Sequence, residues 1–192
     1  MPPKVKLLIV ADHASNYIPK KYNNLGLSKK EIMTHKAYDP GIQDLAVKLS
    51  KKFDSQLVLG KYSRLLIDCN RDINDPTLIS AISDRKLIFG NKNITKHERN
   101  YRINKMYKPY HEKIEQKILE NKINVIISLH SFNPIFKGKK RNLKYGILSN
   151  QDRRLSDLIL NELKKEEKIV GDNEPYKGSL IGDTLHKHAL KR

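Results

Sequence analysis

Short apolar runs separated by polar segments set the pattern of this chain. Residues 5–11 (VKLLIVA) and 125–129 (VIISL) are almost unbroken in apolar character, which is typical of strands covered on both faces. Both runs are followed directly by polar residues. Further runs rich in Leu, Val, Ile or Tyr predict strands at residues 56–62, 64–69, 145–148 and 169–170.

Between these runs the apolar residues recur with the period of a helix. One helical face between residues 42 and 53 collects Ile42, Leu45, Ala46, Leu49 and Phe53. Asp39 followed by Pro40 offers an N-cap with proline in the first turn. Residues 152–165 show a second amphipathic pattern, and Asp183 predicts the cap of a last helix.

Two Ser/Thr-x-x-Glu sequences, at residues 28–31 and 95–98, predict capping boxes. The first opens a short helix through His35, and the second opens a long polar helix toward Asn121. Pro109 lies inside the second helix and lacks a backbone N–H, so we expect it to kink or interrupt that helix.

Strands alternate with helices along the chain, which predicts an α/β domain with a largely parallel sheet. No internal repeat or linker interrupts residues 1–192, so we expect a single domain. Cys69 is the only cysteine and cannot form an internal disulfide, and the first apolar run is too short for a signal peptide or a membrane span. We therefore expect a cytoplasmic protein with no membrane partner.

The charge is strongly positive, with 38 Lys and Arg against 21 Asp and Glu and a formal net charge of +17. Such an excess attracts polyanions. However, only nine of the basic residues are Arg, which is the side chain preferred for reading bases, and no nucleic-acid-binding motif is present. The composition favours a solvated lysine-rich surface over nucleic-acid binding.

Chemically capable groups follow three of the apolar runs. His13 follows the run at residues 5–11, and His130 follows the run at 125–129. Asp68, Asn70 and Arg71 lie at the end of the run at 64–69. Because parallel strands end at one edge of a sheet, we expect these groups to converge. Two imidazoles held there would bind a divalent metal such as zinc, with a carboxylate or amide as third ligand and water in the open position.

Each of these residues also has a structural interpretation. A single His at a strand end is often simply a hydrogen-bonded residue, and Asp68 with Arg71 fits a salt-bridged turn. Asp39 fits a helix N-cap equally well.

Seven motifs, in order over nearly the whole chain, resemble the N-formylglutamate amidohydrolase family, which is related to zinc carboxypeptidases and aspartoacylases. They are DHASN at 12–16 with IP at 18–19, AYDPG at 37–41, YSRLLIDCNR at 62–71, PYH at 109–111, SLHSF at 128–132, NEPY at 173–176 and GDTLH at 182–186. The resemblance implies a three-layer α/β/α fold of the phosphorylase/hydrolase-like type, with a mixed, largely parallel sheet. It also implies one zinc ion and hydrolysis of an N-acyl amide on an acidic amino acid, which is N-formylglutamate in the name-giving case.

The resemblance also implies roles for individual residues. His13 and His130 would be metal ligands. Arg71 would hold the carboxylate of a small anionic N-acyl amino acid, with Asn70 assisting and Asp68 orienting Arg71.

The third ligand is open between Asn16, Asp39 and a water molecule. The wider superfamily has Glu three residues after the first His, where this chain has Asn16, and a neutral amide is a poorer zinc ligand than a carboxylate.

Glu174 is the carboxylate in a motif loop that would act as general base, and Tyr176 would hydrogen-bond the developing oxyanion. The family continues into a further strand with a Glu-x-Arg element, whereas this sequence stops at Arg192. We therefore expect a sheet edge that the last helix or a partner subunit in a homo-oligomer would cover.

Two alternatives to this function stay open. One is a related amidase with a different amide substrate. The other is a catalytically weak relative that binds a small acid or a polyanion.

Overall fold

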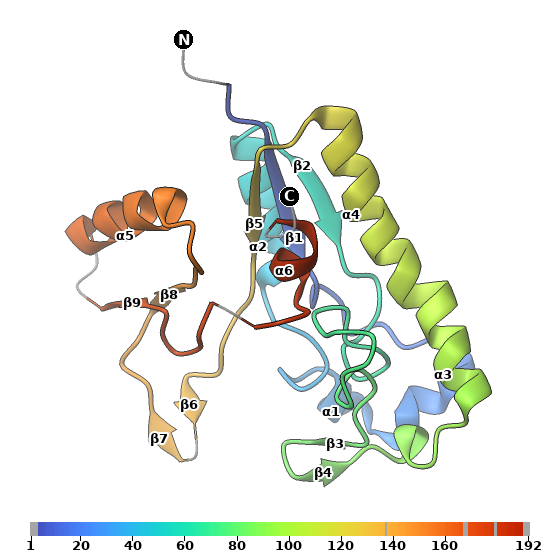
Figure 1. The fold of residues 1–192 in the computed structure, drawn as a ribbon. Helices are drawn as coiled ribbons and strands as arrows, with labels where there is room; N and C mark the ends of the chain where they lie inside the picture. The colour runs from blue at the N-terminus through green and yellow to red at the C-terminus, as the bar shows by residue number, and fades with distance from the viewer. Residues whose placement is uncertain (1–3, 137, 167–168, 179, 190–192) are drawn as a thin grey trace. The chain divides into compact units, whose positions relative to one another are not determined.

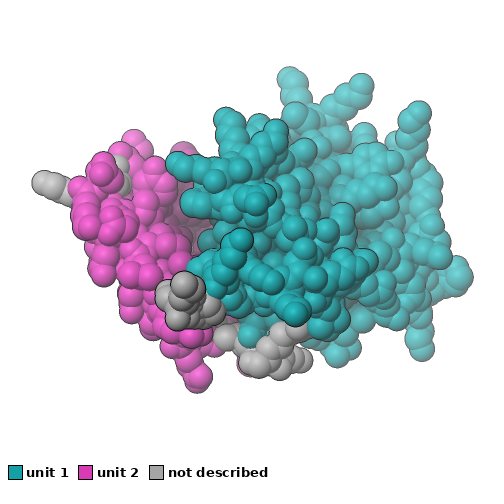
Figure 2. All heavy atoms as spheres, turned by 90° about the horizontal axis from the view of Figure 1, so that it is seen from above, with its two compact units in different colours: residues 1–131, 182–192 teal, residues 132–181 magenta. Residues whose placement is uncertain are grey.

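The computed structural model describes residues 4–136, 138–166, 169–178 and 180–189. The chain divides into two units, Met1–Ser131 with Gly182–Arg192 and Phe132–Ile181, shown in teal and magenta in Figure 2. Each unit is described separately.

A parallel sheet in the order β2-β1-β5 forms the centre of the first unit. Strand β1 (Leu7–Ala11) lies between β2 (Gln56–Leu59) and β5 (Val125–Ser128), and both pairings are parallel. Val10 is in register with Val58 on one side and Ser128 on the other. The carboxyl ends of the three strands are therefore level, and the segments that follow them begin at one edge of the sheet.

Strand β1 lies in the middle of this sheet (Figure 1), and its side chains alternate between two buried faces. Ile9 and Ala11 pack with Ile42 and Ala46 of helix α2 (Ile42–Lys52). On the opposite face, Leu8 and Val10 belong to the larger core cluster, which includes Ile114 and Ile118 of helix α4 (Lys108–Asn121). This double cover explains why the first run lacks polar alternation, and it confirms the predicted α/β fold with a parallel sheet flanked by helices.

Helix α2 begins differently from the prediction. Its N-cap is Gly41, in the left-handed conformation at φ 80°, with no side-chain capping bond. The carboxylate of Asp39 instead accepts a hydrogen bond from the Ser131 N–H at 3.1 Å. The helix-capping interpretation of Asp39 is therefore wrong, and its side chain is free for another role.

The predicted strand at residues 64–69 is also wrong, because this segment forms successive turns. The Ser63 hydroxyl accepts a hydrogen bond from the Leu65 N–H at 3.2 Å, which favours a turn over an extended chain. The Leu65 and Leu66 carbonyls are bound by side chains rather than by a strand: Asn91 donates to the first at 2.7 Å and Arg102 to the second at 3.1 Å. The apolar run is buried either way, so its hydrophobicity could not distinguish the two structures.

The long polar helix is interrupted just before Pro109, as predicted. Helix α3 (Lys96–Arg102) continues through a π-helical turn, η3 (Ile103–Tyr107), into α4. The Thr95 side chain accepts from the Glu98 N–H and caps α3. A wide turn next to a proline fits a residue that cannot donate a backbone hydrogen bond.

The remaining elements of the first unit are short. Helix α1 (Lys29–Ile32) has the predicted capping box of Ser28 and Glu31. Helix α6 (Thr184–His188) starts at Asp183, whose side chain accepts from the His186 N–H as predicted. The others are η1 (Lys20–Gly26), β3 (Ile82–Ser83), β4 (Lys86–Leu87) and η2 (Phe89–Asn91).

The second unit contains a hairpin, β6 (Ile135–Phe136) with β7 (Lys139–Lys140), and a parallel pair, β8 (Tyr145–Ile147) with β9 (Val170–Asp172). Helix α5 (Arg154–Glu166) contacts β8 and β9. The helix predicted at residues 152–165 is confirmed as α5, and the strand predicted at 145–148 is confirmed as β8. The strand predicted at 169–170 is β9, which begins one residue later. Among the described residues no helix is both long and apolar enough to span a membrane.

A buried histidine pair joins α4 to α6. His111 Nε2 donates to the Cys69 carbonyl at 3.0 Å, so its Nδ1 accepts from His188 Nε2 at 2.9 Å. Burial, together with the positive charge of Lys187, lowers the pKa of His111 to about 4. The neutral form of His111 is therefore the one that the fold holds.

This pair makes stability depend on pH. Because the pKa of His111 is lower in the folded than in the unfolded chain, the unfolded chain takes up the proton first as pH falls from about 6.5 to 4. Urea unfolding should show the wild type losing about 3 kcal/mol more over this range than His111→Gln. His97→Gln, which removes an exposed histidine on α3, should keep the wild-type dependence. Parallel pH profiles for wild type and His111→Gln would contradict this assignment.

Candidate metal centre

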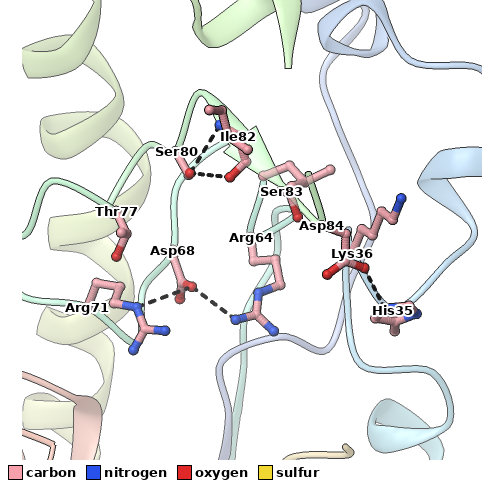
Figure 3. Close-up of a pocket in the computed structure, with 11 residues that line it drawn as sticks. His35, Lys36, Arg64, Asp68, Arg71, Thr77, Ser80, Ile82, Ser83 and Asp84 are labelled. Carbon is pink, nitrogen blue, oxygen red and sulfur yellow. Dashed lines mark hydrogen bonds and ion pairs between the residues drawn. The ribbon is translucent and has the colours of Figure 1, made fainter. Parts of the chain in front are cut away.

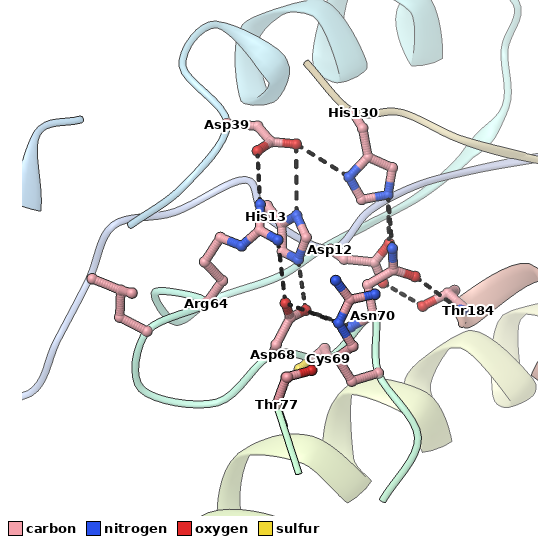
Figure 4. Close-up of polar contacts among 12 residues, drawn as sticks. Asp12, His13, Asp39, Arg64, Asp68, Cys69, Asn70, Thr77, His130 and Thr184 are labelled. Atoms are coloured by element: carbon pink, nitrogen blue, oxygen red, sulfur yellow. Dashed lines mark hydrogen bonds and ion pairs between the residues drawn. The ribbon is translucent and has the colours of Figure 1, made fainter. Parts of the chain in front are cut away.

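Three side chains from separate segments meet at the carboxyl edge of the sheet (Figure 4). His13 follows β1, Asp39 precedes α2 and His130 follows β5. Asp39 Oδ2 lies 3.6 Å from His13 Nδ1 and 3.1 Å from His130 Nδ1, and one ligand atom from each residue falls within 4.8 Å of the others. The Asp39 N–H also donates to the His13 carbonyl at 2.9 Å, which fixes the two segments together.

The Nδ1 atom of His13 is buried and has no hydrogen-bond partner among the residues that the structure describes. A buried polar atom without a partner costs free energy, on the order of 1–3 kcal/mol. A metal ion between His13, Asp39 and His130 would satisfy this atom. The donor set of two imidazoles and one carboxylate is also one that zinc binds in proteins.

A carboxylate lies behind each imidazole. His13 Nε2 is 2.7 Å from Asp68 Oδ1, and His130 Nε2 is 3.2 Å from Asp12 Oδ2. The hydrogen bond to Asp68 places a proton on Nε2 of His13 and directs its Nδ1 toward Asp39. The Nδ1 of His130 faces Asp39 as well. Carboxylates behind ligating histidines are a recurrent feature of metal sites, where they fix the tautomer and the ring orientation.

The electrostatics of this cluster favour a cation. Burial alone would raise the pKa values of Asp12, Asp39 and Asp68, but the neighbouring histidines hold all three below their usual range, with a contribution from Arg64 and Arg71 at Asp68. For His130, burial lowers the pKa, but hydrogen bonds to Asp12 and Asp39 outweigh it and raise the pKa to about 10. Three ionised carboxylates therefore surround the two histidines and hold a proton on His130, a positive charge at the place where a metal ion would bind.

Asn16 lies outside this group. Its side-chain amide donates to the Ile32 carbonyl at 3.1 Å and contacts Met33 Sδ at 3.0 Å. The structure thus brings Asp39, rather than Asn16, together with the two histidines.

The 68–71 turn supplies one wall of an adjacent pocket of about 340 Å³ (Figure 3). Arg64 and Arg71 both line it. Asp68 Oδ2 lies 3.3 Å from Arg64 Nη2 and 4.0 Å from Arg71 Nε. Asp68 thus contacts Arg71 as predicted, but its shorter contact is to His13. The pocket is lined in addition by His35, Lys36, Leu65, Thr77, Ser80, Ile82, Ser83 and Asp84.

Asn70 lies next to the histidines. Its side-chain Nδ2 is 3.4 Å from His130 Nε2, and its Oδ1 accepts from the Thr184 N–H at 3.0 Å. Asn70 therefore connects the metal group to the turn that carries Arg71.

Glu174 and Tyr176 belong to the second unit, in the segment that follows β9. The Glu174–Pro175 peptide bond is cis. Tyr176 is half exposed, and the Arg141 guanidinium lies 5.3 Å from the centre of its ring.

Sequence reasoning did not select Asp12, Arg64 or Thr184. Asp12 directly precedes His13 at the end of a buried strand, where an acidic side chain is unusual, and that signal was available. Arg64 was hidden in a segment expected to be a strand. Thr184 is distant in sequence, and the GDTLH motif that contains it predicted only the Asp183 cap.

Comparisons with known proteins identify the family of this chain. The family model described as FGase, N-formylglutamate amidohydrolase, matches residues 5–192. A solved structure, the crystal structure of gene product Atu2144 from Agrobacterium tumefaciens, superposes with a TM-score of 0.91 at 36% sequence identity, covering 98% of this chain and 77% of that one. No curated protein matches the chain. With a family model that spans nearly its whole length, this chain belongs to the N-formylglutamate amidohydrolase family.

Proposed function

We propose that this protein is a zinc-dependent amidohydrolase that removes an N-formyl or other N-acyl group from an acidic amino acid such as glutamate. Family membership supports the amidohydrolase class. The observation that carries the metal dependence is the buried Nδ1 of His13, which has no hydrogen-bond partner among the described residues and faces Asp39 Oδ2 next to His130 Nδ1.

His13, Asp39 and His130 would hold the ion. Zinc with three protein ligands keeps a position for water, lowers the pKa of that water toward neutrality and polarises a carbonyl. The His130 side chain is 32% exposed whereas that of His13 is 3% exposed, so access to the centre would come from the His130 side.

Arg71 would bind the substrate carboxylate, with Asn70 assisting. The Arg71 side chain is 27% exposed and lines the pocket beside the centre. Within the described part of the chain, the Arg71 side chain makes one long ion pair, to Asp68, so its donors are available for a bidentate pair with a carboxylate. Asp68, which lies between Arg71 and His13, would orient both.

The general base would be Glu174. The carboxylates around the histidines have other roles: Asp39 faces both Nδ1 atoms, Asp68 accepts from His13 Nε2, and Asp12 is paired with His130 at 3.2 Å. A further carboxylate is needed to take the proton of the attacking water and deliver it to the leaving amine. Tyr176, two residues later, would donate a hydrogen bond to the developing oxyanion.

Metal content tests the ligand set. Elemental analysis should find close to one zinc per wild-type chain, and chelation should abolish formate release from N-formylglutamate. His13→Ala and Asp39→Ala should each lose the metal, because each removes one of three ligands. Asn16→Ala is the matched control and should keep it. Wild-type protein that takes up no zinc would refute the metal site, and loss of zinc in Asn16→Ala would assign the third ligand differently.

Steady-state kinetics test the substrate contact. Arg71→Ala should retain zinc and raise KM roughly 10- to 100-fold, the equivalent of one charge-assisted hydrogen-bonded pair of about 1.5–3 kcal/mol. Arg154→Ala removes a side chain that is 91% exposed and should leave KM unchanged. An unchanged KM in Arg71→Ala would exclude Arg71 as the carboxylate-binding residue.

Single-turnover rates test the base. Glu174→Gln should keep zinc and lower kcat by about 100-fold or more, because the amide cannot accept the proton. Glu162→Gln, which changes an exposed residue of α5, should have wild-type kcat. If Glu174→Gln retains kcat, another group acts as the base.

A further inference from the structure

Asp12, the carboxylate behind His130, has a full set of hydrogen-bond donors. Its residue is 2% exposed. Oδ2 is 3.2 Å from His130 Nε2 and accepts from the Ser128 hydroxyl at 3.2 Å. Oδ1 accepts from the Tyr110 hydroxyl at 2.9 Å and from the Thr184 hydroxyl. Oδ1 therefore binds two hydroxyl groups, whereas Oδ2 faces the imidazole of His130 and the Ser128 hydroxyl.

Thr184, near the C-terminal end of the sequence, contacts both Asp12 behind the metal ligand His130 and Asn70 in the turn that carries Arg71. It is the first residue of α6 and is fully buried. Its hydroxyl donates to Asp12, on the metal side, and its N–H donates to Asn70 Oδ1 at 3.0 Å, on the substrate side. Figure 4 shows Thr184 beside Asp12 and Asn70.

Other contacts hold α6 in this place. Lys187 Nζ donates to the Arg71 carbonyl at 2.8 Å, and His188 donates to His111. Gly182, at φ 84°, lies so close to Asp72 that a side chain there would clash with it. The backbone of Thr184 is therefore fixed without the help of its hydroxyl, and removing the hydroxyl should affect Asp12 specifically.

We propose that Thr184 is a positioning residue that fixes the Asp12 carboxylate and, through it, the ring of His130 for metal binding. With two donors on Oδ1, the carboxylate cannot turn about its Cβ–Cγ bond, so Oδ2 stays directed at His130 Nε2. Without the Thr184 hydroxyl, Oδ1 keeps one donor, and the second lone pair is left buried. The orientation of His130 Nδ1 would then be less well defined.

This inference rests on the proposed metal site, and metal affinity measures it directly. Zinc dissociation constants would be determined by competition with a chelator for wild type, Thr184→Ser and Thr184→Val. Valine keeps the shape of threonine without the hydroxyl, and it retains the N–H that Asn70 binds. Loss of a hydrogen bond behind a ligand typically costs 10- to 100-fold in metal affinity. We expect Thr184→Val to bind zinc about 10-fold more weakly or worse and Thr184→Ser to stay near wild type.

A second readout reports the geometry itself. The visible absorption bands of the cobalt(II)-loaded protein depend on ligand arrangement, so they should change in Thr184→Val and be retained in Thr184→Ser. The effect should also disappear in an Asp12→Ala background, where Thr184→Val should weaken zinc binding no further, because Thr184 acts through Asp12.

Circular dichroism and the urea midpoint of the metal-free variants verify folding, and Thr184→Ala replaces Thr184→Val if the latter does not fold. Wild-type zinc affinity and cobalt spectrum in the variant that lacks the hydroxyl would overturn the proposal, as would equal losses in Thr184→Ser and Thr184→Val. A wild type that binds no metal is a different outcome, because it refutes the proposed function itself.

Discussion

The contact between buried aspartates and the two histidines is the constraint on which the first unit depends. Asp12, Asp39 and Asp68 are each no more than 5% exposed, and burying an ionised carboxylate is costly unless charged or hydrogen-bonding partners surround it. The partners come from the ends of β1 and β5, the 63–71 turns, helix α4 and helix α6. These segments are far apart in sequence, so the sheet and its connections must be correctly formed before the carboxylates are satisfied.

Elements defined by local burial could be predicted from the sequence, whereas features that depend on contacts between distant segments could not. Periodicity identified the buried strands at 5–11 and 125–129 and the helices at 42–53 and 152–165, because burial on one or two faces determines which positions in the sequence are apolar. It also placed His13 and His130 at one edge of a parallel sheet. The strand predicted at 64–69 failed because a run of buried Leu and Ile satisfies a turn that is packed in the core as well as a strand. Contacts to side chains such as Asn91 and Arg102 decide between the two, and no local pattern encodes them.

Residues of the metal site also differ in how far the sequence alone predicts them. A ligand such as His13 can be recognised from its place after a strand, whereas the groups that orient it depend on three-dimensional neighbours. Asp39 illustrates the difficulty: its sequence fits a helix cap as well as a third metal ligand, and the pairing of β1 with β5 shows that its carboxylate faces His130. The excess of lysine, likewise, says little about this centre, where the decisive charges are three aspartates and two arginines.

The π-helical turn at Ile103–Tyr107 sets the rotational phase of the helix that follows. One extra residue in a helical turn rotates everything downstream by about 100° relative to a regular α-helix. With this offset, Tyr107 donates to the Arg71 carbonyl at 2.7 Å, and Tyr110 and His111 reach Asp12 and Cys69 from the same side. In an uninterrupted helix of the same length these side chains would face elsewhere. The number of residues between α3 and α4 is therefore part of the site's geometry. Deleting one residue there would rotate Tyr107, Tyr110 and His111 away from their hydrogen-bond partners, while His13, Asp39 and His130 themselves would be unaltered.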